Sequence, residues 1–397
     1  MESIVVVGAS LGGLRVVENI RREGFSGRLT LVGDEPHRPY DRPPLSKEFL
    51  RGEVEADRLS LVKKSEAELS LDTRYGTRAV GLDLAARRVQ LDSGEALDFD
   101  GLVIATGARP RRIDGAAGKE NVFVLRTLDD ARALGLALRA AKRAVVVGAG
   151  FIGLEVAASC KAMGVETTVL EAAPTPCARA LHPALGDFLA SFHHARGVDL
   201  RCGVSIEAFE GEGRVEAVRL ASGERIACDV LVIGIGVTPN VEWLEGSGLS
   251  LENGVRCDES LRASVEGVYA LGDVASFPHP LFDGERMRIE HWTTTVEQAR
   301  LVAQNLVRGE AKAFEKAPLF WSDQFELKIQ GVGRPSPGDE MAIVCGSFEE
   351  GRFLALFGRG GRLVGAYGFG RPAELVKARM AIEKRASFDE ARASIQG

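Results

Sequence analysis

Short runs of consecutive apolar residues recur along the chain, each followed by glycine-rich or acidic residues. Runs without polar alternation are typical of strands that are buried on both faces of a parallel sheet. The predicted strands, several of which are such continuous runs, are residues 4–7, 29–32, 102–105, 144–147, 167–170 and 230–233. Helical patterns follow directly after Gly13 and Gly153. This succession of strands, glycine turns and helices predicts an α/β protein.

One strand-and-turn pattern occurs twice. The segment VVVGASLGGL at residues 5–14 returns as VVVGAGFIGL at residues 145–154. The next strand ends in the acidic pair Asp34 and Glu35 in the first copy, and in Glu171 in the second. The repeat predicts two dinucleotide-binding units in one chain.

The ends of the two units also correspond. DGLVIATGARP at residues 100–110 closes the first unit, and DVLVIGIGVTPN at residues 229–240 closes the second. Further on, GVYALGDVASF at residues 267–277 predicts a strand and a turn that return to the first unit. We therefore expect the second unit to be inserted into the first.

The hydrophobic pattern changes near residue 313. Aromatic and alternating stretches such as PLFWSDQFELKIQGVG precede a charged helix that we expect from about residue 372 to 384. Alternation of this kind is typical of antiparallel strands with one covered face. The pattern predicts a smaller α+β domain at this end of the chain.

Composition and charge narrow the class of protein. A chain of 397 residues with 45% hydrophobic and 27% charged residues predicts a globular protein of two or three domains. A net charge of −6 argues against general nucleic-acid binding, which needs clustered Lys and Arg. We expect no targeting peptide, because the first predicted strand begins at residue 4, and no membrane span, because no apolar run reaches roughly 18 residues. The expected location is the cytoplasm.

The cysteines predict neither a redox centre nor a metal site. They lie apart in the sequence and form no CxxC pair, which argues against a dithiol centre and against clustered zinc or iron–sulfur ligands. We expect buried thiols and no metal. The six residues are Cys160, Cys177, Cys202, Cys228, Cys257 and Cys345.

The second glycine turn has the residues that a dinucleotide site needs. Gly148, Gly150 and Gly153 let the backbone approach a pyrophosphate, whose charge is met by the amide groups at the helix start. Glu171, 18 residues after Gly153, is placed to accept hydrogen bonds from the adenosine ribose. Its carboxylate would repel the extra phosphate of NADPH, so the sequence predicts NADH. Arg179 lies close in the sequence and could weaken that preference.

The first glycine turn keeps Gly8, Gly12 and Gly13, and Asp34 follows Gly13 by 21 residues. Ser10 stands where the second glycine is expected. Its side chain lies where the backbone should pass closest to a phosphate. On these residues alone, the turn is compatible with a nucleotide site or with a degenerate one.

A longer motif, PYDRPPLSKEFL at residues 39–50, is not explained by the fold alone. Together with the motifs around it, the chain resembles the NADH-dependent ferredoxin reductases of bacterial oxygenase and cytochrome P450 systems. Members of that family are FAD flavoproteins with a glutathione-reductase-like fold, and the apoptosis-inducing factor flavoproteins are more distant relatives. The resemblance covers essentially the whole chain and rests on these motifs, in the family's order: GASLGGLR, PYDRPPLSK, LVIATGARPR, VFVLRTLDDA, VVVGAGFIGLEVAA, GVTPN, YALGDVA, EHW and FWSDQF.

The resemblance implies two Rossmann-like domains and a third, C-terminal α+β domain. Residues 1–110 and 241–312 would bind FAD, residues 111–240 would bind NADH, and residues 313–397 would form an interface domain.

The resemblance also implies a set of FAD contacts. Asp34 would bind the adenosine ribose, Asp273 a ribityl hydroxyl, and Trp292 the flavin ring edge through its backbone. Family members tolerate small residues at the second glycine, and a serine hydroxyl can donate to phosphate, which favours a working first site. The expected FAD contacts are Gly8, Ser10, Gly12, Gly13, Asp34, Arg42, Lys47, Val80, Ala105, Thr106, Gly107, Arg126, Asp273 and Trp292.

For NADH, the resemblance implies contacts on the second turn and two catalytic residues beside the flavin. Lys47 and Glu155 are expected near flavin N5, paired without NADH and parted when the nicotinamide enters. A carboxylate at Glu155, in the first helical turn, also interacts well with the helix dipole. Trp321 is the third catalytic candidate, expected to pack near the flavin. The expected NADH contacts are Gly148, Gly150, Phe151, Ile152, Gly153, Glu155, Glu171 and Gly236.

The implied electron acceptor is a small acidic [2Fe-2S] ferredoxin that serves a cytochrome P450 or a ring-hydroxylating oxygenase. Between residues 352 and 385 there are eight basic and two acidic residues, a balance of +6 in a chain of −6. We expect this region to attract the acidic partner, and we expect the protein to be a monomer.

Several alternatives differ in acceptor or in role. A rubredoxin reductase differs only in its acceptor, and a redox-sensitive scaffold like the apoptosis-inducing factors would carry long extensions that this chain lacks. A disulfide reductase, NADH oxidase or peroxidase needs a cysteine beside the flavin, and residues 39–50 contain none. A membrane quinone reductase is disfavoured by the charged C-terminal tail.

Overall fold

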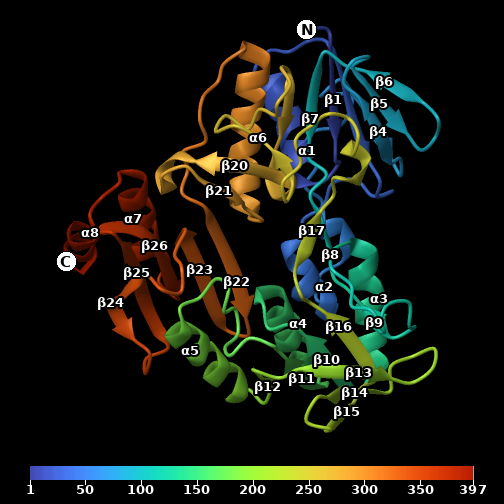
Figure 1. Cartoon of the computed structure of the whole chain (residues 1–397). Coiled ribbons are helices and arrows are strands. Elements are labelled where there is room, and N and C mark those ends of the chain that lie inside the picture. The colour runs from blue at the N-terminus through green and yellow to red at the C-terminus, as the bar shows by residue number, and fades with distance from the viewer. Residues whose placement is uncertain (397) are drawn as a thin grey trace. The chain divides into compact units, whose positions relative to one another are not determined.

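The computed structural model describes residues 1–396, which form two compact units (Figure 1). The first unit comprises Met1–Asp41, Ser60–Arg109 and Thr238–Phe320. The second comprises Arg42–Leu59, Pro110–Val237 and the chain from Trp321 onward. Each unit is assembled from three separate stretches of sequence. The predicted domain boundaries at residues 110, 240 and 312 stay predictions.

A parallel sheet forms the centre of the first unit. Its strands are β1 (Ser3–Val7), β2 (Arg28–Gly33), β3 (Leu71–Tyr75), β7 (Gly101–Ile104) and β19 (Val268–Ala270), in the order β19-β7-β1-β2-β3. Every pairing in it is parallel. Val5 and Val6 in β1 are almost completely buried, as expected for β-branched residues in a strand covered on both faces.

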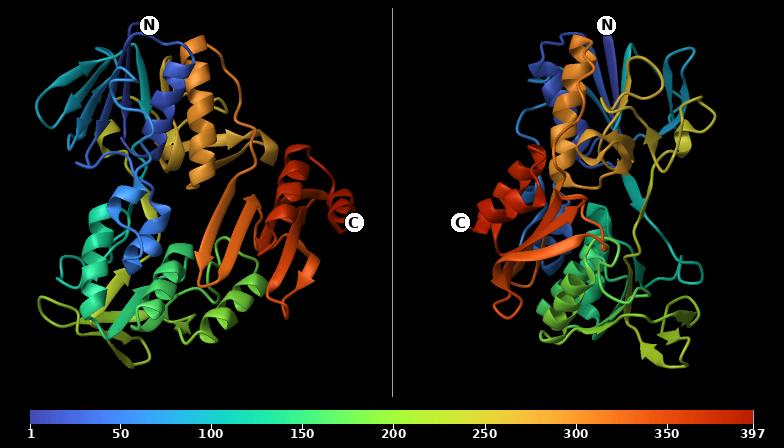
Figure 2. Two further views of the ribbon diagram at one scale, coloured as in Figure 1. Left: turned by 180° about the vertical axis from the view of Figure 1, so that it is seen from behind. Right: turned by 60° about the vertical axis from the view of Figure 1, so that its left-hand side comes forward.

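Two helices pack against each other in this unit, α1 (Leu11–Arg22) and α6 (Trp292–Arg308) (Figure 2). Val16, Val17 and Ile20 form the buried face of α1, at the three- and four-residue spacing of an amphipathic helix. The β19 strand returns the chain to this sheet, as the sequence predicts.

The smaller elements that follow belong mostly to the first unit. Two three-stranded sheets have the orders β4-β5-β6 and β18-β20-β21, and β8 pairs with β17 where the chain passes between the units. The bounds are β4 (Ala79–Asp83), β5 (Arg88–Leu91), β6 (Ala96–Asp98), β8 (Ala108–Pro110), β17 (Val237–Pro239), β18 (Val255–Arg256), β20 (Ala275–His279) and β21 (Glu285–Arg288). Four 3-10 turns are η2 (Ala56–Leu59, in the second unit), η3 (Glu242–Leu244), η4 (Gly272–Val274) and η5 (Pro280–Phe282).

The second unit repeats the parallel design. Its sheet has the order β12-β11-β10-β16-β9, formed by β9 (Val122–Phe123), β10 (Arg143–Val147), β11 (Glu166–Leu170), β12 (Asp199–Arg201) and β16 (Val230–Ile233). The helices of this part are α3 (Leu128–Ala140), α4 (Phe151–Ala162) and α5 (Pro183–His194). A small antiparallel sheet contains β13 (Ile206–Glu210), β14 (Ala217–Leu220) and β15 (Arg225–Ala227).

Two further parts belong to the second unit. Residues 42–59 contain the turn η1 (Pro43–Ser46) and the short helix α2 (Glu48–Arg51). The C-terminal part is a five-stranded sheet of order β22-β23-β26-β25-β24 with two helices. Its elements are β22 (Leu319–Gln324), β23 (Leu327–Gly333), β24 (Glu340–Ser347), β25 (Arg352–Arg359), β26 (Arg362–Phe369), α7 (Pro372–Glu383) and α8 (Phe388–Gln396).

The structure confirms the predicted α/β class and the six predicted strands. It also confirms the antiparallel character of the C-terminal part and a helix near residues 372–384, observed as α7. No helix within residues 1–396 is long and apolar enough to cross a membrane.

Candidate functional site

Two glycines of each turn are required by the protein's own backbone. Gly8 has a φ of +117° and Gly148 a φ of +103°, a region that residues with a Cβ rarely adopt. A Cβ at either would overlap a carbonyl oxygen of the loop after the neighbouring strand. A Cβ at Gly13 or Gly153 would overlap the carbonyl oxygen of the first glycine of its own turn. Strand and helix therefore pack closely at both turns.

The second position of each turn is different. A Cβ at Gly150 would meet no atom within 4 Å, so the space there is open. Ser10 takes the equivalent position in the first turn and precedes α1 with an extended backbone. The fold itself does not demand glycine here, which makes Ser10 sterically compatible with the turn. Beside the open space, Ile152 is 50% exposed at the start of α4, so an apolar surface is available to a ligand.

Glu171 directly follows β11, and its side chain contacts the second glycine turn. Its Oε2 accepts a hydrogen bond from the backbone N–H of Ala149 at 2.7 Å, and its Oε1 accepts one from Ala173 at 2.8 Å. The predicted ribose acceptor and the predicted pyrophosphate turn thus lie side by side.

Asp34 is not the structural counterpart of Glu171. The strand pairs β1–β2 and β10–β11 have the same register relative to their glycine turns, which places Gly33 where the second copy has Glu171. Asp34 comes one residue later, with its side chain 62% exposed and its Oδ2 3.9 Å from Arg78 Nη2. Contact between Asp34 and a ribose stays a prediction.

The ATG segment, residues 105–107, follows β7 and is hydrogen-bonded to Asn240. Asn240 is the last residue of the GVTPN motif. Thr106 Oγ1 donates to the carbonyl oxygen of Asn240 at 2.8 Å, and Asn240 Nδ2 donates back to the Thr106 carbonyl at 2.9 Å. The Asn240 N–H also donates to the carbonyl of Gly107 at 3.0 Å. The Ala105 N–H donates to the carbonyl of Val7 in β1. Asn240 was not predicted as a site residue, although its amide at the end of a motif is a recognisable signal.

Asp273 lies in η4, next to the first glycine turn. A Cβ at Gly12 would approach Leu271 and Thr295, which flank this turn. The backbone N–H of the first residue of η4 donates to Gln298 Oε1 at 2.7 Å. The amide nitrogen of Gln298 is buried and has no hydrogen-bond partner within residues 1–396. The structure therefore brings Asp273 to the first turn, with a polar group nearby that the protein alone does not satisfy.

Trp292 and Val80 complete the predicted contacts in the first unit. The indole N–H of Trp292 donates to Asp41 Oδ1 at 2.8 Å, so this side chain is directed to the protein. That orientation is compatible with the predicted use of its backbone. Val80, in β4, is 49% exposed.

In the second unit, Arg42 and Arg126 meet although they come from separate motifs. The Arg42 guanidinium donates to the backbone carbonyl of Arg126 at 2.5 Å. The segment that contains η1 and α2 packs against α3 and α4. Ser159 Oγ of α4 donates to the carbonyl of Ser46 at 2.6 Å, which ties η1 to this helix.

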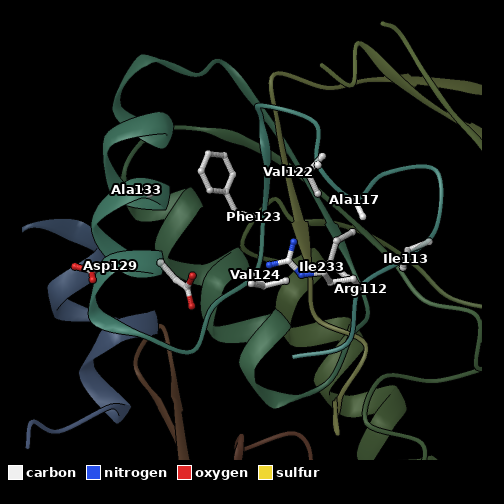
Figure 3. A pocket seen from close by; sticks show the side chains of 11 residues that line it. Arg112, Ile113, Ala117, Val122, Phe123, Val124, Asp129, Ala133 and Ile233 are labelled. Atoms are coloured by element: carbon white, nitrogen blue, oxygen red, sulfur yellow. The ribbon is translucent and has the colours of Figure 1, made fainter. Parts of the chain in front are cut away.

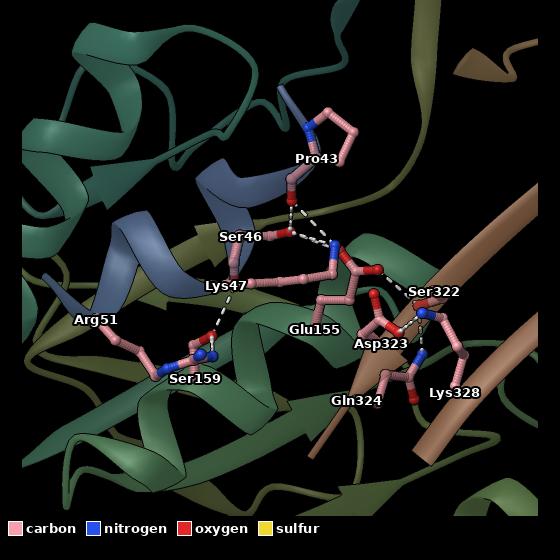
Figure 4. Close-up of polar contacts among 10 residues, drawn as sticks. All are labelled: Pro43, Ser46, Lys47, Arg51, Glu155, Ser159, Ser322, Asp323, Gln324 and Lys328. Carbon is pink, nitrogen blue, oxygen red and sulfur yellow. Dashed lines mark hydrogen bonds and ion pairs between the residues drawn. The ribbon is translucent and has the colours of Figure 1, made fainter. Parts of the chain in front are cut away.

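A buried ion pair lies between η1 and α4 (Figure 4). Lys47 Nζ is 2.8 Å from Glu155 Oε2, and the two side chains are only 8% and 6% exposed. Ser46 Oγ also donates to Glu155 Oε2 at 2.5 Å, and Ser322 Oγ donates to Oε1 at 2.6 Å. A buried pair persists only where the remaining lone pairs have donors, and these two serines supply them. The structure brings the two predicted catalytic residues together.

Ser322, the neighbour of the predicted Trp321 in β22, contacts Glu155. Adjacent residues of a strand point to opposite faces, and Ser322 faces Glu155. Trp321 itself is half-buried. Ser46 and Ser322 were missed as site residues because a serine carries no signal of its own until a charged partner is known.

The remaining NADH candidates cluster at the second turn. Phe151 begins α4 and Gly236 follows β16 with a φ of +98°. A Cβ at Gly236 would lie 3.3 Å from Arg179 Nη2, so the exposed Arg179 lies beside this turn. Its effect on the choice between NADH and NADPH stays a prediction.

Two cavities lie away from the predicted site residues. A cavity of about 290 Å³ lies at β9, β16 and α3 and is lined by residues that include Arg112, Phe123 and Asp129 (Figure 3). A hollow of about 680 Å³ lies at α5 and the β22–β23 hairpin. None of the predicted site residues lines either one.

The thiols are mostly buried and unreactive. Four of the six are buried, and Cys202 and Cys345 are half-buried. Burial raises the pKa of Cys160, Cys228 and Cys257 to about 12, so these thiols stay protonated at neutral pH. Within residues 1–396 no three His, Cys, Asp or Glu side chains gather in a way that could hold a metal ion.

The basic C-terminal region is partly neutralised. Arg359 pairs with Asp339, which lies outside the segment counted in the sequence. Arg371 lies 3.9 Å from Glu350 and 3.6 Å from Glu374, and Arg379 lies 3.5 Å from Glu383. Lys377 and Lys384 are exposed on and beside α7, close in sequence to the exposed apolar residues Val376 and Met380.

Comparisons with known proteins agree over the whole chain. The family model described as pyridine nucleotide-disulphide oxidoreductase matches residues 2–299, and the model described as reductase C-terminal matches residues 319–394. The ferredoxin–NAD(+) reductase component of the p-cumate 2,3-dioxygenase system of Pseudomonas putida is 38% identical over 395 residues, covering 99% of this chain and 96% of that protein. Putidaredoxin reductase of the same species is 36% identical over 392 residues, covering 97% and 92%.

Solved structures agree as well. The reductase in the crystal structure of the covalent putidaredoxin reductase–putidaredoxin complex has a TM-score of 0.93 and 33% identity, and the match covers 99% of this chain and 98% of that one.

Proposed function

The chain belongs to the pyridine nucleotide-disulphide oxidoreductase family, and from that premise we propose that it is an FAD flavoprotein that takes a hydride from NADH and passes electrons singly to a [2Fe-2S] ferredoxin. The terminal acceptor behind the ferredoxin would be a cytochrome P450 or a ring-hydroxylating oxygenase. The observation that carries the proposal is the presence of two dinucleotide turns together with the buried Lys47–Glu155 pair in one chain. The named relatives, a ferredoxin–NAD(+) reductase component and a putidaredoxin reductase matched over more than nine tenths of their length, support the choice of acceptor.

The first unit fits FAD. Strand and helix pack closely at Gly8 and Gly13, as in a turn that binds a pyrophosphate, and Ser10 can serve as a hydroxyl donor. Asp273 in η4 adjoins this turn, and the unsatisfied amide of Gln298 is a polar group that a bound ligand or water could satisfy. When bound, FAD supplies the conversion from a two-electron donor to one-electron acceptors.

The second unit fits NADH. Open space at Gly150 and the exposed Ile152 leave room for a ligand at the start of α4. Glu171 is held beside this turn by backbone N–H groups, as a ribose acceptor should be. Its negative charge disfavours the 2′-phosphate of NADPH.

Lys47 and Glu155 would act through charge and position. Glu155 presents a carboxylate that can accept from the nicotinamide carboxamide, and Lys47 provides a positive charge that stabilises negative charge developing nearby. Because both are buried, each needs a partner when the other leaves. Lys47 already has one, since its Nζ donates to the carbonyl of Pro43 at 3.0 Å.

We propose the exposed lysines of the C-terminal part, Lys377 and Lys384, as the docking surface for an acidic ferredoxin. Neither has an ion-pair partner within residues 1–396, so their charge is available to a partner. A monomer in the cytoplasm, where NADH is supplied by catabolism, completes the proposal.

The test is steady-state oxidation of NADH by the FAD-loaded protein with a panel of [2Fe-2S] ferredoxins and rubredoxins, repeated with NADPH. We expect kcat/KM to be at least about tenfold higher with NADH, since a carboxylate facing an added phosphate costs on the order of 1–2 kcal/mol. Replacement Glu171→Ala should narrow that ratio. Slow reoxidation by every carrier would favour a redox-sensitive scaffold, and rapid turnover only with rubredoxin would identify a rubredoxin reductase.

A further inference from the structure

A line of buried polar side chains continues from Glu155 on the side away from Lys47. Ser322, Gln324 and His193 are all completely buried. Gln324 Nε2 donates to Ser322 Oγ at 3.1 Å, and His193 Nε2 lies 2.8 Å from Gln324 Oε1. Ser322 and Gln324 alternate along β22 and so share one face, shown in Figure 4, while His193 comes from α5. The line connects α4 and α5 with β22, which is distant from both helices in sequence.

Each donor in this line points toward Glu155. Gln324 Oε1 can only accept, so His193 donates from Nε2 and carries no proton on Nδ1. Burial lowers the pKa of His193 to about 4, which keeps the imidazole neutral near pH 7. Its Nδ1 is buried without a partner within residues 1–396, which suits an atom that carries no proton. The Gln324 amide then donates to Ser322, and the Ser322 hydroxyl donates its own proton to Glu155.

The two carboxylate oxygens of Glu155 have different kinds of partner. Oε2 accepts from Lys47 and Ser46, and both have an alternative acceptor in the carbonyl of Pro43, at 3.0 and 3.4 Å. Oε1 accepts from Ser322, whose own oxygen is already occupied by Gln324. Both partners of Oε2 therefore keep a hydrogen-bond acceptor when they leave it, whereas Ser322 is held in place by Gln324.

We propose that Ser322, held by Gln324 and His193, fixes Oε1 of Glu155, so that Oε2 is the atom that exchanges Lys47 and Ser46 for the carboxamide N–H of the nicotinamide. The inference rests on the proposed function, because it takes NADH as the molecule that meets Glu155. Ser322 and Gln324 are positioning residues in this scheme. Fixing one oxygen leaves the other in a defined direction, which reduces the freedom lost when the nicotinamide binds.

Two alanine substitutions, one at a partner of each Glu155 oxygen, test whether the two oxygens have different roles. We expect Ser322→Ala to raise the KM for NADH and the calorimetric Kd for NAD+ about 5- to 20-fold, with kcat within about twofold, because it removes a hydrogen bond to a charged group. Ser46→Ala removes a group that competes with the carboxamide for Oε2, so it should not raise either value. An unchanged Kd in Ser322→Ala, or equal increases in both variants, would overturn the proposal.

Conservative variants separate positioning from general damage. Ser322→Thr keeps the hydroxyl and should restore the Kd for NAD+ to within about threefold of the wild type. Gln324→Met keeps the volume but loses both hydrogen bonds, so it should raise the Kd in the same direction as Ser322→Ala and serves as the test if Ser322→Ala does not fold. A wild-type Kd in Gln324→Met would contradict the proposal.

The wild-type protein distinguishes this inference from the function on which it rests. If it neither oxidises NADH nor binds NAD+, the proposed function is wrong. If it does both and the variants bind NAD+ as the wild type does, only the role of Ser322 and Gln324 is wrong. FAD content and thermal unfolding are measured on every variant to confirm that the fold is retained.

Discussion

Lys47 and Glu155 show how much a single pair of residues depends on its surroundings. Their side chains are almost completely buried, and four polar contacts on Glu155 and Lys47 compensate for the lost water. Removal of one charge leaves the other without its partner in the interior, which is far more costly than removal of a surface charge.

The first prediction follows from this burial. Lys47→Met should lower the free energy of unfolding by about 3 kcal/mol, because Glu155 is left as an uncompensated buried carboxylate. The matched control is Lys142→Met at an exposed lysine, which should change it by less than about 0.5 kcal/mol. Urea unfolding of the FAD-loaded proteins measures both. Equal effects in the two variants would show that the pair is not buried in solution.

The second prediction concerns pH and His193. Its pKa is lowered by burial to about 4, from an ordinary value of 6.5. Between these values the unfolded state binds the proton and the folded state does not, so the free energy of unfolding rises with pH from about 4 to 6.5. On acidification to pH 4 this residue should account for a loss of about 3 kcal/mol.

Adjacent histidines provide the control. His193→Gln should remove that part of the pH dependence, while His194→Gln, at an exposed position, should leave it in place. Urea unfolding at a series of pH values compares the slopes. If His193→Gln retains the wild-type slope, then His193 is not the buried neutral group that the structure describes.

At the scale of the element, the strand–turn–helix unit explains why the two glycine turns differ. The first and third glycines are enclosed by backbone in both copies, whereas the second position, Gly150 in the second copy, faces open space. The packing of the fold therefore requires glycine at the first and third positions. At the second position, any requirement for glycine comes from the bound nucleotide. Ser10 is permitted because it stands at the position that the fold leaves open.

The third prediction separates these two roles in the second turn. Gly148→Ala should destabilise the protein by more than about 2 kcal/mol, since its φ of +103° and the nearby carbonyl exclude a Cβ. Gly150→Ala should leave the unfolding temperature nearly unchanged and raise the KM for NADH several-fold. Thermal unfolding and steady-state kinetics measure the two effects. A strongly destabilised Gly150→Ala variant would contradict the assignment.

At the scale of the whole molecule, net charge is a poor guide to the exposed charge. The net charge of +6 for residues 352–385 includes three arginines that pair with acidic side chains. Two of these acidic partners, Asp339 and Glu350, lie before residue 352 and so are not included in that net charge. Screening by such pairs weakens long-range attraction, so an acidic partner should respond mainly to the exposed lysines.

The fourth prediction tests that response. Lys377→Glu with Lys384→Glu should raise the KM for an acidic ferredoxin at least about fivefold at low salt, with a smaller effect at high salt. NADH oxidation with ferricyanide, which needs no docking surface, should be unaffected. Charge reversal at the exposed Lys63 and Lys64 of the first unit is the control. Equal effects of the two double variants would indicate general repulsion and no docking site.

Much of the fold could be predicted because it is encoded locally. Four of the six strands follow from uninterrupted apolar runs, the turns follow from glycines at positions that require them, and Glu171 follows the strand that leads to the second turn. The place of Asp34 depends on more than the spacing along the chain. One residue of register separates it from the place of Glu171, and register is set by strand pairing.

By itself, then, the sequence determined the α/β class, the two dinucleotide turns and the residue types at each. Tertiary structure alone decided that Lys47, Glu155 and Ser322 meet, that Asn240 holds the ATG segment, and that Gln324 and His193 support the cluster. The physical reason is the separation in sequence over which each kind of interaction acts. Backbone conformation and burial pattern are properties of neighbouring residues, whereas a buried charge finds its donors among elements more than a hundred residues away.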